Sequence, residues 1–349
     1  MRLTLNEVKK RIDKMIPKGL EYDIDVEAGS IAIITHTPQE FGKGGGESLT
    51  VKIAKSIKRR VVIRPHMDLL LSEDEVEQKI LETIPNEAMV RNIFIDPALS
   101  EVTIECDDPS TAVGHKGTII QSLRDEIGWL VNVTRAPAFE SRTQHDIRRY
   151  RREMADDRRG LLRKFGTRIY RPKRPGQPWA RITALGSYRE VGRAMHLVTT
   201  NESKVLVDVG AKPTVNKNEI QPFFNAPELL PLDNIDAVVL THAHVDHIAM
   251  LPVLFRYGYR GPVYCTPPTR DLMTLLQIDY IKVAQAEGTD PPYSKADIQE
   301  CIKHVVDIGY GEKTDIAPDI KISMENAGHI LGSSSVYMHI GEGSHEHRL

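Results

Sequence analysis

The stretch "THAHVDHIAM", residues 241–250, follows the apolar run "IDAVVL" and gathers ionisable side chains at the end of an expected buried strand. Three histidines and an aspartate occur within six positions: His242, His244, Asp246 and His247. A single histidine beside a strand is usually an ordinary core or surface residue, but this spacing is rare by chance. Neutral imidazole and carboxylate are the groups that bind zinc and similar divalent metals. The stretch therefore predicts a metal site.

The spacing of this motif also indicates which of its residues would bind each of two metals. Alternate residues of an irregular turn point the same way, so His242 and His244 can share one metal while Asp246 and His247 turn toward a second. Two neighbouring metals would hold a hydroxide and stabilise both the attacking and the leaving oxygen of a phosphoryl displacement. The motif is thus typical of half of a dinuclear hydrolase site.

The composition sets broad limits on the protein. Its 349 residues are too many for one ordinary core, which favours two or three domains. Lysine and arginine number 46 against 48 acidic residues, so the overall charge says nothing about partners. The cysteines, Cys106, Cys265 and Cys301, form no CxxC pair, which argues against a disulfide framework and a thiolate metal site. No apolar run has the length of a membrane helix, and the charged start is no signal peptide. We expect a cytoplasmic protein with no membrane partner.

An internal repeat appears when the first residues are displaced by 68 positions. "VKKRIDKMIP" (8–17) then lies over "VEQKILETIP" (76–85), with matching valine, isoleucine and proline positions. Each copy continues with two strand-like runs, a glycine-containing turn that opens a helix, and a further β-rich run. Chance similarity between two helices is the alternative. The repeated order predicts two small α/β domains in tandem.

A GxxG turn lies between two expected helices of each copy. In the second copy it is Gly114-His115-Lys116-Gly117, after two strands and before an apolar-periodic helix. A lone GxxG is usually only a turn, but this context resembles the loop of K-homology (KH) domains. That resemblance implies a loop that lets a nucleic-acid backbone approach closely, with the lysine supplying positive charge.

The first copy has a less clear version of the same loop. Gly42-Lys43-Gly44-Gly45 fits the pattern only if a four-residue gap is allowed in the repeat. Both loops are retained as predicted RNA-binding sites, with stronger support for the second.

A basic segment follows the repeat. Residues 142–174 contain 13 Lys or Arg against four Asp or Glu. Such a run is often only a solvated face, but beside a KH-like loop it also suits phosphate contacts. We expect a charged helix to about Phe165, then the linker "RPKRPGQP" and a domain boundary near residue 175.

The remainder alternates short strands and turns. Two strand-like runs end in Asp208 and His242, where loops commonly build a site. Asp208 is either a simple turn residue or an acceptor that orients a ligand histidine. His329 lies in a glycine-flanked loop between two later strands, and it is the best remaining candidate for a further metal ligand.

Four signatures now carry a family resemblance: "GSYREVGRAMHLV", "VLVDVG", "THAHVDH" and "NAGHILGSSSV". They resemble the metallo-β-lactamase fold in its β-CASP nucleic-acid-processing branch. With two KH-like modules in front, the chain is similar to the archaeal cleavage and polyadenylation specificity factor ribonucleases. The resemblance implies a metal-dependent ribonuclease in RNA 3′-end formation and transcription termination, with possible 5′-to-3′ exonuclease activity, homodimerisation of the full-length form, and contact with RNA polymerase or the termination machinery.

The resemblance also assigns ligands residue by residue. It implies that His242, His244 and His329 bind one zinc and that Asp246 and His247 bind the other. Asp208 matches a supporting aspartate at a strand end.

This chain departs from the family pattern after His329. The family has a later aspartate that bridges both metals, whereas no aspartate follows His329 here, so we expect a truncated stretch or an incomplete site. We do not expect His345 and His347 to replace it, because a terminal segment is usually mobile. We therefore expect two zincs in the complete family site but one or fewer held tightly by this chain, and weak or no cleavage.

The predicted fold class is α/β and α+β multidomain: two tandem KH-like α/β domains and a partial metallo-β-lactamase αβ/βα sandwich. The expected domains are KH-like at 1–69 and 70–137, a basic helical connector at 138–178, and the incomplete metallo-β-lactamase domain at 179–349. The predicted function is a zinc-dependent endonuclease whose KH modules bind single-stranded RNA. The alternatives are a non-catalytic RNA-binding fragment or paralogue and, less favoured, a small-molecule metallo-hydrolase sharing the fold.

Overall fold

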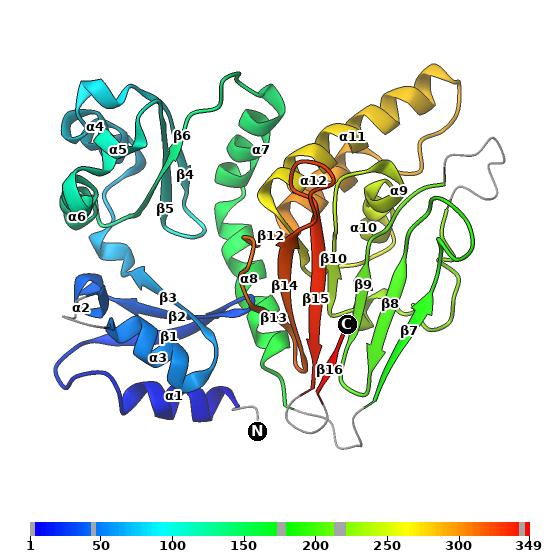
Figure 1. Cartoon of the computed structure of the whole chain (residues 1–349), viewed down its shortest axis with the longest axis horizontal. Coiled ribbons are helices and arrows are strands. Elements are labelled where there is room, and N and C mark those ends of the chain that lie inside the picture. The colour runs from blue at the N-terminus through cyan, green and yellow to red at the C-terminus, as the bar shows by residue number, and fades with distance from the viewer. Residues whose placement is uncertain (1–3, 43–46, 173–178, 213–220, 342–345) are drawn as a thin grey trace. The chain divides into compact units, whose positions relative to one another are not determined.

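The computed structural model describes residues 4–42, 47–172, 179–212, 221–341 and 346–349. These residues form two compact units (Figure 1). Unit 1 comprises Met1–Leu5, Ala28–Ser30 and Leu161–Leu349, and unit 2 comprises Asn6–Glu27 and Ile31–Gly160. Each unit is considered separately below. The predicted site residues Lys43, Gly44 and Gly45, and the tail residue His345, lie outside the described residues.

The repeat has the same order of elements in both copies. The first is α1 (Leu5–Asp13), β1 (Tyr22–Glu27), β2 (Ser30–Thr35), α2 (Pro38–Gly42), α3 (Leu49–Ile57) and β3 (Arg60–Pro65). The second is α4 (Glu73–Thr83), β4 (Val90–Asp96), β5 (Glu101–Cys106), α5 (Pro109–Val113), α6 (Thr118–Ile127) and β6 (Leu130–Arg135). Each copy has a three-stranded sheet with its strands in chain order. In the second sheet β4 pairs antiparallel with β5, and β5 pairs parallel with β6.

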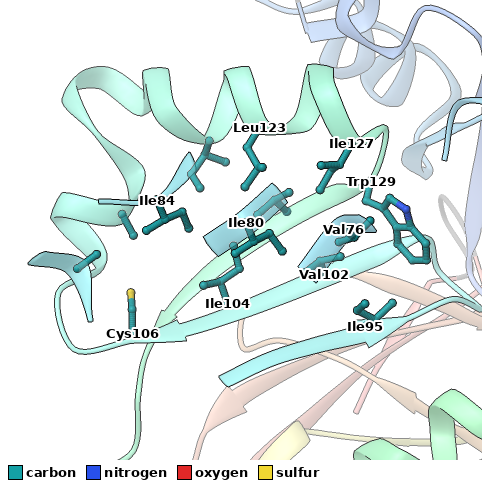
Figure 2. Close-up of a cluster of buried hydrophobic side chains, with 14 residues drawn as sticks. Val76, Ile80, Ile84, Ile95, Val102, Ile104, Cys106, Leu123, Ile127 and Trp129 are labelled. Atoms are coloured by element: carbon teal, nitrogen blue, oxygen red, sulfur yellow. The ribbon is translucent and has the colours of Figure 1, made fainter. Parts of the chain in front are cut away.

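The second copy has a well-defined apolar core (Figure 2). Val76 and Ile80 of α4 and Leu123 and Ile127 of α6 are fully buried against the inward side chains of β5, including Ile104. These helix residues recur three or four positions apart, so each helix buries one stripe against one face of the sheet. The capping box of Ser72 and Glu75 starts α4 by satisfying backbone amides of its first turn.

The basic segment forms two helices, α7 (Arg142–Glu153) and α8 (Ala155–Ile169), instead of one helix ending near Phe165. Met154 separates them in a non-helical conformation. Most arginines of the segment pair with acidic side chains inside their own unit: Arg148, Arg149, Arg151, Arg152, Arg158, Arg159, Arg168 and Arg171. Arg158 is 2% exposed and contacts Asp96. The positive charge of the segment is therefore largely used to attach these helices within the fold.

Unit 1 contains two sheets. The six-stranded sheet has the order β12-β11-β10-β9-β8-β7, and the four-stranded sheet has the order β13-β14-β15-β16. The strands of the first are β7 (Ala180–Ala184), β8 (His196–Thr200), β9 (Lys204–Val207), β10 (Ala237–Val239), β11 (Val263–Cys265) and β12 (Val305–Asp307). Those of the second are β13 (Thr314–Ala317), β14 (Ile320–Asn326), β15 (Ser334–Ile340) and β16 (His347–Arg348).

The two sheets pack face to face. Buried residues of β8 to β11, such as Val205 and Val239, meet buried residues of β13 to β15, such as Ile322 and Met338, in one cluster. Strands β9 to β12 run parallel, whereas β7, β8 and β9 are antiparallel neighbours. This mixed α/β architecture agrees with the predicted fold class.

Four helices follow the strands of unit 1: α9 (Val245–Ile248), α10 (Leu251–Arg256), α11 (Pro267–Ala286) and α12 (Lys295–His304). Helix α12 ends at His304, and the next three residues form the edge strand β12 beside β11. A three-residue strand is too short to show a period in the sequence. Among the described helices, none is long and apolar enough to cross a membrane.

Candidate metal centre

The predicted metal ligands lie where two neighbouring parallel strands end. Strand β9 leads into Asp208, and β10, its parallel partner, leads into residues 241–247. The backbone N–H of Asp208 donates to the carbonyl of Val239, 2.9 Å away. Because the carboxyl ends of parallel strands share one edge of a sheet, residues that are 33 positions apart in the chain meet here.

Gly210 allows the two strand ends to approach each other closely. The amide of Val209 donates to the carbonyl of His247 at 2.7 Å, and that of Ala211 donates to the carbonyl of Val245 at 3.1 Å. A Cβ atom on Gly210 would lie 1.6 Å from the carbonyl oxygen of Asp246. Only glycine fits between these two bonds. The sequence analysis did not single out this residue, although it ends the quoted run "VLVDVG".

Three histidines of the predicted set converge. Nε2 of His242 and Nε2 of His329 each lie 3.1 Å from Nδ1 of His244. The three ligand atoms are all within 4.8 Å of one another. A single imidazole nitrogen has either one proton or one lone pair, so it cannot form full hydrogen bonds with both neighbours. Nitrogens at about 2.0–2.1 Å from a tetrahedral zinc are about 3.3–3.4 Å apart. The donor set and its spacing therefore fit one divalent metal.

Asp208 and Thr241 orient the ring of His242. The Thr241 hydroxyl donates to Oδ2 of Asp208 at 2.8 Å and lies 2.9 Å from Nδ1 of His242. Because the hydroxyl proton is given to the carboxylate, the hydroxyl oxygen accepts the Nδ1 proton of His242. This arrangement leaves the lone pair of His242 on Nε2, toward His244 and His329. Sequence reasoning missed Thr241, whose only signal was its position before the first histidine.

Asp208 also orients His247. Its Oδ2 atom lies 2.8 Å from Nδ1 of His247, and its Oδ1 atom accepts the backbone N–H of Thr241 at 2.8 Å. Asp208 is 3% exposed and has a positive φ of 59°, which is unusual for a residue other than glycine. Strained conformations of this kind persist where surrounding contacts require them. Asp208 therefore accepts hydrogen bonds from Thr241 and lies within hydrogen-bond distance of His247, as the orienting role predicts; that it supports a metal ligand stays a prediction.

The two oriented histidines have opposite pKa shifts. Burial, followed by the charge of His247, lowers the pKa of His242 to about 4, so its ring is neutral at neutral pH. Burial also lowers the pKa of His247, but its hydrogen bond to Asp208 and the charges of Asp208 and Asp246 outweigh that effect and raise it. A neutral ring is the form that binds a metal.

Asp246 and His247 form the second predicted pair. Oδ2 of Asp246 lies 3.6 Å from Nε2 of His247, the nitrogen that faces away from Asp208. Among the described residues, no third histidine, cysteine or carboxylate completes a compact group with this pair. His347, considered as a substitute ligand, is exposed in β16 and belongs to neither group.

The loop that carries His329 is held in place by residues that the sequence analysis did not identify. The Ser333 hydroxyl accepts the backbone N–H of His329 at 3.1 Å, and the N–H of Ser334 donates to the carbonyl of Thr241 at 2.8 Å. The Gly332 carbonyl accepts the hydroxyl of Thr266 at 2.7 Å. The third histidine is thereby attached both to the metal-binding turn and to the start of α11.

A second loop, residues 186–193, reaches the same turn. Three of its non-glycine residues, Ser187, Arg189 and Arg193, have positive φ, and Tyr188 is 75% exposed. Glu190 anchors the loop by accepting from Arg193 at 2.5 Å and from Lys212 at 2.8 Å. Immediately after it, the amide of Ala194 donates to the carbonyl of Asp246 at 2.8 Å. The base of the loop is fixed while its tip is presented to solvent.

The second GxxG turn has the expected open geometry. Gly114, Lys116 and Gly117 have φ of 75°, 52° and 81°, and His115 and Lys116 are exposed. A Cβ on Gly114 would be 2.6 Å from Ile119, whereas Gly117 has no atom within 4 Å of that position. In the first copy, Gly42 is the last residue of α2 and the rest of its loop lies outside the described residues.

Comparisons with known proteins match the first repeat and the domain that contains the metal centre. Residues 2–70 match the model of the transcription termination factor FttA KH domain, and residues 197–344 match that of the metallo-beta-lactamase superfamily domain. The transcription termination factor FttA of Methanosarcina mazei is 40% identical over 342 residues, covering 98% of this chain and 53% of that protein. The FttA of Pyrococcus abyssi is 42% identical over 348 residues, with the same coverage.

The chain therefore spans about half the length of the curated relatives it matches. Among solved structures, Rm3 metallo-beta-lactamase aligns with 45% of this chain and 54% of its own chain, at 18% identity and a TM-score of 0.30. A similarity that low carries no argument, whereas the sequence matches show a KH domain and a domain whose superfamily implies a divalent metal.

We expect Gly210→Ala to disrupt the centre, because its Cβ would overlap the Asp246 carbonyl. Overpacking of this kind typically costs about 1–3 kcal/mol, and the displaced turn should also lose bound metal. Thermal unfolding and metal content measure the two effects. Gly160→Ala in α8 is the matched control, because no atom lies within 4 Å of the added Cβ. This variant should lose neither thermal stability nor bound metal. Unaltered metal content in Gly210→Ala would contradict the close approach.

We expect Thr241→Val to weaken metal binding by about 10–100-fold, the usual effect of removing a partner that orients a ligand histidine. Valine has nearly the shape of threonine but cannot link His242 to Asp208. Thr241→Ser keeps the hydroxyl and should bind metal almost normally. Competition with a chromophoric chelator measures both affinities. Equal affinities for the valine and serine variants would show that the hydroxyl does not orient the ring.

Proposed function

This chain belongs to the FttA-like proteins, which join a KH domain to a metallo-β-lactamase superfamily domain, and from that premise we propose that it is a zinc-dependent ribonuclease acting on single-stranded RNA in transcription termination. The observation that carries the proposal is the convergence of His242, His244 and His329 in a chain that also carries an exposed RNA-type loop in its other unit. Because the relatives are about twice as long, the activity is proposed for this chain and not transferred from them.

His242, His244 and His329 would hold the first metal. Their nitrogens are within reach of one ion, and the neutral ring of His242 needs no deprotonation before it binds. Asp246 and His247 would contribute to a second metal, with Asp208 keeping His247 in the tautomer that leaves Nε2 free. Zinc is favoured because imidazole-rich, four-coordinate sites suit it. When bound, such an ion polarises a phosphoryl oxygen and makes water a nucleophile at neutral pH.

The chain's own residues supply rigidity and positioning around that ion. Asp208, Thr241 and Ser333 fix the ligand rings through the hydrogen bonds described above. Tyr188 and Arg189, exposed on the anchored loop, are suited to contact a base and a phosphate of the substrate. These two side chains would guide the RNA toward the cluster of His242, His244 and His329.

The GxxG loop of the second copy would bind the RNA backbone. Gly117 leaves open space where phosphate must approach, and Gly114 lets the loop pack against Ile119. Lys116 is exposed with the uncapped amino end of α6 behind it. A small-molecule metallo-hydrolase would have no use for such a loop. Exonuclease activity, homodimerisation and contact with RNA polymerase remain predictions from the family resemblance.

We expect Lys116→Asp to weaken binding of a labelled single-stranded RNA about tenfold or more, since a hydrogen bond to a charged group contributes about 1.5–3 kcal/mol. The salt dependence of binding should also become shallower by about one phosphate contact. Lys282→Asp, an exposed lysine of α11, makes the same change in net charge and should bind normally. An equal loss of RNA affinity in both variants would mean that only the overall charge matters and not the position of Lys116.

We expect His244→Ala to abolish metal retention and RNA cleavage while leaving RNA binding intact, because Nδ1 of His244 is the atom that both other ligands face. Metal content, filter binding and slow cleavage of single-stranded RNA with added zinc separate the three properties. His347→Ala is the matched control, since that exposed histidine is outside the cluster. Cleavage at the wild-type rate in His244→Ala would refute the proposed centre, as would a requirement for His347 instead.

A further inference from the structure

A second group of metal-binding side chains lies in the first repeat of unit 2. His36 is the first residue after β2, and His66 is the first after β3, the neighbouring strand. The backbone N–H of His66 donates to the carbonyl of Thr35 at 2.9 Å, which places the two strand ends side by side. The imidazole rings stack with centroids 4.0 Å apart and an interplanar angle of 25°. Two strands therefore deliver two stacked histidines to one edge of the sheet.

Asp68 completes the group. Its Oδ2 atom lies 3.2 Å from Nδ1 of His66 and 3.9 Å from Nε2 of His36. One ligand atom from each of the three residues lies within 4.8 Å of the others. Among the described residues, no lysine or arginine forms an ion pair with this carboxylate. The carboxylate thus faces two histidines and no permanent cation.

The contacts within the group call for a positive charge between its members. Nδ1 of His66 accepts the backbone N–H of Asp68 at 3.3 Å. A ring nitrogen whose lone pair accepts a hydrogen has no proton for the carboxylate beside it. Oδ2 therefore lies 3.2 Å from a nitrogen that donates no proton to it, and a cation held there would take the Nδ1 lone pair in place of the backbone contact.

We propose that His36, His66 and Asp68 bind a divalent transition metal of the zinc class. Two imidazoles and one carboxylate suit such ions, whereas calcium and magnesium prefer all-oxygen sites. His36 and Asp68 are exposed, so water can fill the remaining coordination positions. This site shares no residue with the histidine cluster of unit 1 and does not depend on the proposed ribonuclease activity.

The metal would stabilise the connection between the two repeats. His66 caps the single turn Met67–Leu69 that leads from β3 toward α4, and Asp68 lies within that turn. The following segment contacts the second repeat, since the amide of Leu71 donates to the carbonyl of Ile127 at 3.0 Å. A metal bound to His36 would attach this connection to the end of β2. Its role is structural: it fixes the segment that joins the two sheets.

The second repeat shows that the fold itself does not need these histidines. The residues in the matching positions are Asp107, after β5, and Ala136, after β6, where the amide of Ala136 donates to the carbonyl of Cys106 at 2.8 Å. Asp107 pairs with Arg91 at 2.6 Å. The same strand ends are thus stabilised there by an ordinary ion pair, while the first repeat has three metal-type ligands.

The test uses the whole chain with the other cluster removed by His242→Ala and His244→Ala. This background protein is stripped with a chelator and titrated with Co²⁺, whose visible absorption reports coordination, and with Zn²⁺ by calorimetry. We expect one equivalent of each ion to bind. Adding His36→Ala and His66→Ala should abolish that binding, and adding Asp68→Asn should weaken it by more than about tenfold, since even residues that only orient a ligand contribute that much.

Two controls make the result decisive. His145→Ala in the background protein removes an exposed histidine of α7 in the same unit and should leave the stoichiometry unchanged. Zinc should raise the unfolding temperature of the background protein but not that of the variant lacking His36 and His66, with far-UV circular dichroism confirming that both are folded. The proposal is overturned if the background protein binds no metal, or if binding persists without His36 and His66, which would indicate nonspecific surface binding.

Discussion

The carboxylate of Asp208 is the interaction on which the candidate metal centre depends. It accepts hydrogen bonds from the backbone and hydroxyl of Thr241 and from the ring of His247. An ionised carboxylate only accepts, so every donor that it faces is fixed in direction. The Thr241 hydroxyl donates to Asp208 and therefore accepts the Nδ1 proton of His242. Nε2 of His242 is left with its lone pair toward the other ligands. One buried acid thus sets the tautomer of one ligand in each of the two predicted metal groups.

The backbone around this acid makes the arrangement rigid. Gly210 lets the turn that carries the ligands form hydrogen bonds to the end of β9 on both sides of the close approach. Ala194 and Ser334 attach two further segments to the same turn. Ligand side chains supported in this way need little reorganisation when a metal binds. The site is therefore formed by four chain segments held together by backbone hydrogen bonds at one sheet edge.

The histidine clusters in the two units differ in a physically meaningful way. The ring of His242 is partly buried and has a lowered pKa, so it is neutral and ready to bind. His36 and Asp68 are exposed and lie at the ends of adjacent strands of a small sheet. Both clusters include exposed members, so solvent reaches each of them. The first differs in that Thr241 and Asp208 orient the ring of His242, whereas an ion in the second would only cross-link the chain. The arginines of α7 and α8 illustrate the same effect of context, because a run that suggested RNA phosphates is mostly paired with carboxylates such as Asp96 and Glu105.

The sequence by itself determined the local features of this protein. The period of apolar residues predicted the repeated helices and strands, and the spacing of His242, His244, Asp246 and His247 predicted a metal site at a strand end. These features depend on neighbours in the chain. Thr241 and Gly210 became meaningful only in the tertiary structure, because the parallel pairing of β9 and β10 brings the end of β9 to the turn that carries the histidines. His36 and His66 likewise meet only because β2 and β3 are neighbours in their sheet. Which strands are neighbours in a sheet, and not the order of residues along the chain, decided which donors and ligands meet.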